Sequence, residues 1–213
     1  QPPGGRTILL SKVEETLVTA GGQRYELATN EYPGVLHPQG YRYLTAFTRD
    51  PWPTWTYTCG DTVLEKRLLL VDGENTVVVQ YELKSGGAAS LELRPFTAFR
   101  DYHHLRQASA ATPLLALEDG LVKLQSPDDA GIELFLAHDA VEATATGDWY
   151  RDLEYAIERD RGLDFREDLW QPCLLEFPLG ELAAQSGFER LAFDEMPDPV
   201  YRFVLAPAKF SPA

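Results

Sequence analysis

The segment Thr54-Trp-Thr-Tyr-Thr-Cys59 alternates strictly between threonine and a larger or apolar side chain. In an extended strand successive side chains point to opposite faces, so the threonines share one face and the other three residues share the other. The same period of two recurs at residues 76–83, 91–94 and 132–136. These patterns predict β-strands that turn one face toward a core.

Further strands are predicted at 6–11, 14–19, 23–28, 41–48, 62–71, 121–125, 140–145, 173–177, 188–193 and 201–205. Turn signals separate many of them, including Gly21-Gly22, Gly60-Asp61, Asp72-Gly73 and Asp119-Gly120. Parallel sheets need long crossover connections, and regular helical crossovers are missing from this pattern. The sequence therefore predicts an all-β chain folded as a large two-layer antiparallel β-sandwich.

One short helix is predicted near residues 148–162. Asp148 can cap its start and Gly162 can end it. Between them, apolar side chains recur at helical spacing, at positions 149, 153, 156 and 157. This is the single segment that favours a helix over a strand.

Charge and hydropathy exclude several classes of partner. The chain of 213 residues carries 33 acidic and 19 basic side chains, a formal net charge of -14. Such a balance repels phosphate backbones and anionic lipids, so neither nucleic acid nor a membrane is expected as a partner. No apolar run approaches the roughly 20 residues of a membrane span, and no secretion signal is visible. A cytoplasmic location is expected.

The two cysteines, Cys59 and Cys173, lie 114 positions apart by sequence number. One long-range disulfide would be compatible with this spacing, but two buried free thiols are favoured for a chain in a reducing compartment. No cysteine and histidine cluster has metal-ligand spacing, so neither a metal site nor a cofactor is predicted.

Residues 31–57 form the most unusual segment. Prolines and two glycines interrupt regular structure there, yet the segment is rich in tyrosine and tryptophan. Aromatic faces and guanidinium groups suit stacking on sugar rings and bonding to hydroxyls. The alternative is a rigid loop that docks on another domain. The candidate carbohydrate-binding or interdomain residues are His37, Tyr41, Arg42 and Trp52.

A second cluster follows a predicted strand at residues 99–104 and supplies three more candidates, Arg100, Asp101 and His103. An acid or base role is chemically feasible for such groups. His103 and His104 are adjacent on an extended chain and face opposite ways, which disfavours a shared metal. We expect this cluster to lie beside residues 32–57, on one surface.

Residues 162–170 hold three carboxylates, at Asp164, Glu167 and Asp168. Glycoside hydrolysis needs two carboxylates roughly 5–10 Å apart across the scissile bond. Sequence spacing does not establish such a distance. A solvated loop with salt bridges to Arg161 and Arg166 is the favoured interpretation, and no catalytic residue is assigned.

Six blocks of the chain resemble, in order, a known family. They are residues 11–16, 31–44, 63–67, 74–81, 93–103 and 161–172. They are similar to the N-terminal domain of bacterial and archaeal glycogen debranching enzymes of the amylo-α-1,6-glucosidase type, over most of residues 6–180.

The resemblance implies a galactose-mutarotase-like β-sandwich, or supersandwich. It implies that the whole enzyme hydrolyses α-1,6 branch points in glycogen or limit dextrin, with its catalytic carboxylates in a C-terminal (α/α)6 barrel. None of those acids maps onto this chain, which is expected to be inactive alone. Residues 1–206 would be the N-terminal domain and 207–213 the start of a linker. The expected partners are the enzyme's own catalytic domain and glycogen or another branched α-glucan.

Two other functions stay open at this point. The first is a free-standing carbohydrate-binding module, which would bind glycan without a catalytic domain. The second is a mutarotase-like sugar epimerase, which would need a base and an acid, usually histidine and glutamate, in one cleft of the sandwich.

Overall fold

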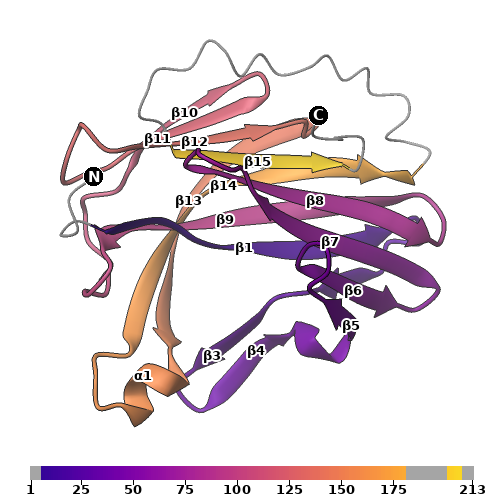
Figure 1. Cartoon of the computed structure of the whole chain (residues 1–213), viewed down its shortest axis with the longest axis horizontal. Helices are drawn as coiled ribbons and strands as arrows, with labels where there is room; N and C mark the ends of the chain where they lie inside the picture. The colour runs from indigo at the N-terminus through magenta and orange to yellow at the C-terminus, as the bar shows by residue number, and fades with distance from the viewer. Residues whose placement is uncertain (1–5, 181–200, 208–213) are drawn as a thin grey trace.

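The computed structural model describes residues 6–180 and 201–207, and these residues form two β-sheets (Figure 1). The first sheet has the strand order β2 (Arg24–Glu26), β1 (Thr7–Thr19), β9 (Ala89–Asp101), β14 (Arg166–Leu179), β13 (Glu142–Glu154), β3 (Thr29–Tyr32), β4 (Val35–Gln39). The second has the order β10 (Leu114–Glu118), β11 (Leu121–Gln125), β12 (Glu133–His138), β15 (Tyr201–Pro207), β8 (Thr76–Ser85), β7 (Thr62–Leu70), β6 (Thr54–Cys59), β5 (Leu44–Thr48). The predicted all-β sandwich is confirmed.

Strand pairing is antiparallel except around β15, which runs parallel to both β12 and β8. The strand predicted at 201–205 is therefore present, and it lies between strands that are distant from it in sequence. Turn signals between strands predict pairing only for strands that follow one another in sequence. Nothing in the local sequence therefore indicates that β15 lies between β12 and β8.

The main core lies between the sheets and follows the alternation read from the sequence. Tyr57 and Cys59 of β6 are buried, whereas Thr58 between them is exposed. Leucines at alternate positions of β9, Leu91 and Leu93, are 1% and 0% exposed. Both cysteines are buried free thiols, as favoured, and burial raises the pKa of the Cys59 thiol to about 11.

The first sheet curls until it nearly closes on itself. Strands β2 and β3 occupy distant positions in the sheet order, yet only Leu27 and Ala28 separate them along the chain. In Figure 1 the lower parts of β13 and β14 swing away from the sandwich, and β3 and β4 return beneath β1. The curled part encloses a second apolar cluster built on Phe96, Ala98, Leu153 and Leu169.

One short helix is present, as predicted, but its predicted bounds are wrong. Only α1 (Ala156–Asp160) is helical, and residues 148–154 belong to β13. They pair with β14, for example Trp149 with Trp170, and the pairing shifts register before Leu153. At this bulge Asp152 adopts a φ of 59°, and its backbone N–H donates to Asp168 at 2.8 Å. Residues four positions apart suit a bulged strand as well as a helix, and pairing with β14 decides between them.

Three strands were not predicted: β3, β4 and β10. Pro33 and Gly34 form the turn between β3 and β4, and Pro38 lies within β4, so the local signals there are those of a loop. The predicted strand 41–48 is only β5, because Gly40–Arg42 forms the short 3₁₀ helix η1. The strand predicted at 188–193 and the linker residues 208–213 lie outside the described residues.

Candidate functional site

Exposed apolar side chains are concentrated in one stretch of the chain, residues 35–52. Of the twelve large hydrophobic side chains that are exposed among the described residues, six lie within residues 35–52. We call these six the 35–52 surface: Val35, Leu36, Tyr41, Leu44, Phe47 and Trp52. They come from β4, η1, β5 and the loop that follows β5. The strands β4 and β5 are the terminal strands of their sheets, so this surface lies where both sheets end.

The predicted residues of this segment are all at or near the surface. Trp52 is 43% exposed and Tyr41 is 49% exposed. His37 and Arg42 are also exposed, and the Arg42 guanidinium lies 6.0 Å from the centre of the Tyr41 ring. The structure therefore brings Tyr41 and Arg42 together and places Trp52 and His37 on the adjoining β5–β6 loop and β4.

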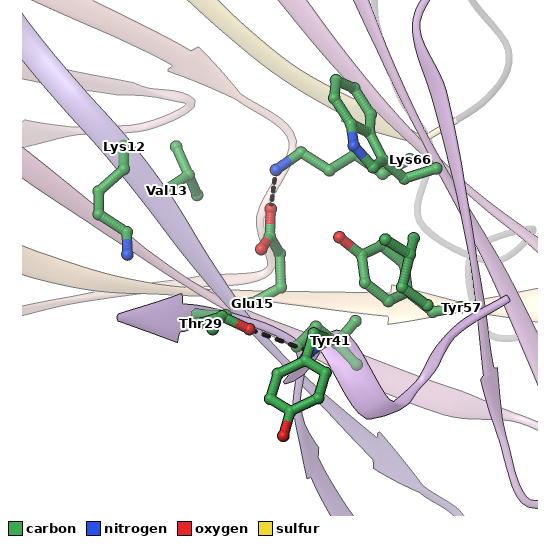
Figure 2. Close-up of a pocket in the computed structure, with 11 residues that line it drawn as sticks. Lys12, Val13, Glu15, Thr29, Tyr41, Tyr57 and Lys66 are labelled. Atoms are coloured by element: carbon green, nitrogen blue, oxygen red, sulfur yellow. Dashed lines mark hydrogen bonds and ion pairs between the residues drawn. The ribbon is translucent and has the colours of Figure 1, made fainter. Parts of the chain in front are cut away.

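A cavity of about 260 Å³ opens beside Tyr41, between β1 and the strands β5 to β7 (Figure 2). Its buried charge is Glu15, whose carboxylate accepts hydrogen bonds from Lys66 at 2.5 Å and from the Tyr81 hydroxyl at 2.7 Å. We call it the Glu15 cavity. Burial, reinforced by the Glu15 carboxylate, raises the pKa values of Tyr57 and Tyr81 well above the usual range, so both hydroxyls stay protonated.

The aromatic wall of the Glu15 cavity is held in place. The Lys66 ammonium lies 5.8 Å from the centre of the Trp55 ring. The Phe47 ring packs against Trp55, with the two ring centres 5.2 Å apart. The backbone N–H of Tyr41 donates to the Thr29 hydroxyl at 2.9 Å. The predicted core orientation is confirmed for Tyr57, and the half-buried Trp55 also packs against the core; both residues line the cavity.

Gly40 positions Tyr41 because the chain at η1 presses against the link between β2 and β3. The backbone N–H of Gly40 donates to the Ala28 carbonyl at 2.8 Å. A Cβ at Gly40 would lie 2.0 Å from the Leu27 carbonyl oxygen, which no side chain tolerates. Glycine is therefore the residue that allows this close approach.

A second cavity, of about 270 Å³, adjoins the first and shares Lys12 and Thr29 with it. We call it the Asn30 cavity. Its other lining residues are Ser11, Asn30, Glu31, Leu153, Glu154 and Tyr155. Lys12 donates to the Asn30 side chain and forms an ion pair with Glu14 at 3.0 Å. Sequence inspection missed both cavities, because their residues come from strands far apart in the chain.

The Arg100 cluster is not beside the 35–52 surface, contrary to expectation. Arg100 pairs with Ile8 across the sheet, seven residues along β1 from Glu15, which is about 20 Å at the usual rise per residue. Asp101 accepts hydrogen bonds from the backbone of His103 at 2.8 Å and lies 3.0 Å from its ring. These residues stabilise the local turn after β9.

The carboxylates near the start of β14 are structural, and the predicted solvated loop is wrong for two of them. Glu167 is fully buried and pairs with the Arg100 guanidinium, and it accepts the Tyr155 hydroxyl at 2.5 Å. Asp168 accepts backbone N–H groups of Ala108 and Asp152, each at 2.8 Å. Only Asp164 is exposed.

Arg161 and Arg166, the expected partners of those acids, pair elsewhere, with Glu158 and Glu154. The prediction failed because β14 begins at Arg166, so Glu167 and Asp168 lie on a strand whose residues 167–169 are all buried.

Histidines and metal-ligand clusters do not contribute to either cavity. His37, His103 and His104 are exposed, and His138 is buried at the end of β12. Across residues 6–180, no group of three or more histidine, cysteine, aspartate or glutamate side chains is placed to hold a metal ion. The acid and base pair that an epimerase would need is therefore not formed by a histidine in these cavities.

Comparison with known proteins identifies the family. A family model described as glycogen debranching enzyme N terminal matches residues 1–185. The chain belongs to this family. The match includes the 35–52 surface and the lining of both cavities. No curated protein and no solved structure matches the chain. Within its described residues, this debranching-enzyme domain has no helix that is long and apolar enough to cross a membrane.

Proposed function

We propose that this chain is the non-catalytic N-terminal domain of a glycogen debranching enzyme and that it supports the catalytic domain of the same polypeptide. In this proposal the whole enzyme hydrolyses α-1,6 branch points of glycogen or limit dextrin in the cytoplasm. The domain docks through the 35–52 surface. The observation that carries the proposal is the concentration of exposed apolar side chains in residues 35–52, at the terminal strands of both sheets.

Physical chemistry favours a covered surface here. Exposed apolar patches of this kind mark interaction sites, and aromatic side chains are enriched at such interfaces. Among the residues that the structure describes, the edge strands β4 and β5 also leave backbone groups without a neighbouring strand. A catalytic domain that follows in the same polypeptide would cover both features, and the family description supports such an arrangement.

The hydrogen bonding of the buried carboxylates also agrees with a support role. Glu167, Asp168 and Glu15 are each occupied by hydrogen bonds that fix the fold. The free-standing binding module is the second candidate, and the two adjoining cavities favour it. Glycan binding without docking would distinguish the module from the support domain.

The test is to change the surface in the whole enzyme. Trp52→Ala and Arg42→Ala should each lower kcat/KM on branched glucan about tenfold, the effect of losing an interface anchor. The same changes should leave the melting temperature of the 213-residue chain unaltered, because both side chains are exposed. Tyr102→Ala changes an aromatic side chain that is 49% exposed in the turn after β9, and it is the matched control. Wild-type activity in both variants, or unfolding of the isolated chain, contradicts the proposal.

A further inference from the structure

The Glu15 and Asn30 cavities adjoin, and their volumes are about 260 and 270 Å³. Small-molecule sites in proteins occupy roughly 300–1,000 Å³, so the pair together falls within this range while each alone lies just below it. A ligand that fills both must therefore have two compact units joined near Lys12 and Thr29.

The Glu15 cavity offers a ring-shaped ligand an aromatic wall and fixed polar groups. Trp55 and Tyr57 supply aromatic side chains, and the Glu15 and Lys66 pair supplies an acceptor and a donor. Glu15 is 4% exposed and is held by Tyr81 from the opposite sheet, so its carboxylate is preorganised. Rigid groups lose little conformational entropy when a ligand binds.

The Asn30 cavity is more polar. Asn30 is 5% exposed and its amide donates to Glu14 at 2.6 Å, while Lys12 donates to its side-chain oxygen. Glu31 and Glu154 add carboxylates that Arg159 partly neutralises. Hydroxyl groups, which donate and accept at once, suit such a lining of mixed donors and acceptors.

The charge of the lining disfavours an anionic ligand. Lys66 is paired with Glu15 and Lys12 is paired with Glu14, so neither ammonium is an uncompensated anion site. The chain as a whole carries a net charge of -14, which repels anions further. A neutral polyhydroxylated ligand agrees with this charge and with the mixed donors and acceptors of the lining.

We infer that the two cavities bind two consecutive glucosyl units of a linear α-1,4-linked glucan chain, one unit in each cavity. This inference rests on the proposed function, because the family's link to glycogen selects an α-glucan among neutral sugars. The domain then holds a glucan chain at a site separate from Trp52, and Tyr41 lies at the boundary between this site and the 35–52 surface.

The test is calorimetric titration of the 213-residue chain with maltotetraose, with cellotetraose as the stereochemical control. Maltotetraose should bind with a Kd on the order of 1 mM, as expected for a small ligand in an open site. Tyr41→Ala and Lys12→Met should each weaken binding at least tenfold. Trp52→Ala, an exposed aromatic outside both cavities, should change it less than twofold.

Amide chemical shifts of the wild-type chain provide a second measurement that needs no variant. On adding maltotetraose, the perturbed residues should centre on Lys12, Thr29 and Tyr41. No binding at 20 mM maltotetraose, equal affinity for cellotetraose, or shifts centred elsewhere overturns the inference. If the chain does not bind maltotetraose, the predicted loss of kcat/KM in the Arg42→Ala whole enzyme still stands, because that loss depends on docking. The two tests therefore distinguish failure of this inference from failure of the docking proposal.

Discussion

At the scale of single residues, the buried charges of this domain stabilise its shape. Glu167 illustrates this, because the curled first sheet encloses its carboxylate together with Arg100 and Tyr155. A buried carboxylate of this kind resembles a catalytic acid when only the sequence is known. Its hydrogen bonds show that it anchors the loop after β9 to β14.

Glu167→Ala should lower the free energy of unfolding by about 3–5 kcal/mol, because it leaves the Arg100 guanidinium buried without its partner. Glu158→Ala removes a surface pair with Arg161 at 3.4 Å and should cost less than about 1 kcal/mol. Urea unfolding of both variants checks the contrast. Similar losses in the two variants would show that the Glu167 pair is not the anchor described here.

Asp139 makes stability depend on pH. Burial raises its pKa from 3.8 to about 7, and one carboxylate oxygen is buried without a hydrogen bond within the described residues. Between those values the folded chain keeps a proton that the unfolded chain releases, so this contribution to stability is full below about pH 4 and is lost as pH rises through 7. Burial lowers the pKa of the neighbouring His138 to about 4. Between pH 4 and 6.5 the unfolded chain therefore binds a proton that the folded chain does not, so this group makes stability rise with pH.

Asp139→Asn removes the first effect and leaves the second. The free energy of unfolding of the variant, relative to wild type, should be on the order of 1 kcal/mol higher at pH 8 than at pH 4.5. This difference is smaller than the full pKa shift implies, because the carboxyl group retains some solvent access. Urea unfolding at the two pH values measures the difference. The same stability change at both values would mean that Asp139 is not buried as a neutral acid.

At the scale of elements, the sequence predicted what alternation and turns encode. Strand β6, with its threonines on one face, was recognised, and so were β8 and β12. The strands β3 and β4 were missed because prolines and a glycine mask the pairing that tertiary contacts impose. The amphipathic spacing at 149–157 predicted a helix, but pairing with β14 and a bulge at Asp152 produced a strand.

The candidate site was predictable only in part, for a related reason. Tyr41 and Trp52 stood out because aromatic side chains are unusual in a proline-rich segment. Glu15 did not, because its partners Lys66 and Tyr81 lie 51 and 66 positions away. No local pattern marks a contact between strands of different sheets.

Gly40→Ala tests the contact between η1 and the β2–β3 link. The added Cβ would meet the Leu27 carbonyl at 2.0 Å, so η1 must move and the free energy of unfolding should fall by at least about 3 kcal/mol. Gly87→Ala is the control, because no atom lies within 4 Å of its added Cβ. Thermal melts of the two variants check this, and equal melting temperatures would mean that η1 is not held against β2 and β3.

At the scale of the whole molecule, the domain is a sandwich with one curled sheet and an apolar surface at the ends of both sheets. The core does not require that surface, since Trp52 and Phe47 are exposed. Its presence is explained when a second domain covers it. In the proposed function, the 35–52 surface is the feature that connects this fold to the catalytic domain of the debranching enzyme.

Hydrogen–deuterium exchange tests that connection most directly. Amide exchange across residues 35–52 is compared between the 213-residue chain and the whole enzyme, with residues 102–104 as the reference segment. The account predicts that residues 35–52 exchange at least tenfold more slowly in the whole enzyme, while residues 102–104 exchange at the same rate in both. Equal exchange of residues 35–52 in the two proteins would contradict the proposal that this surface docks the catalytic domain.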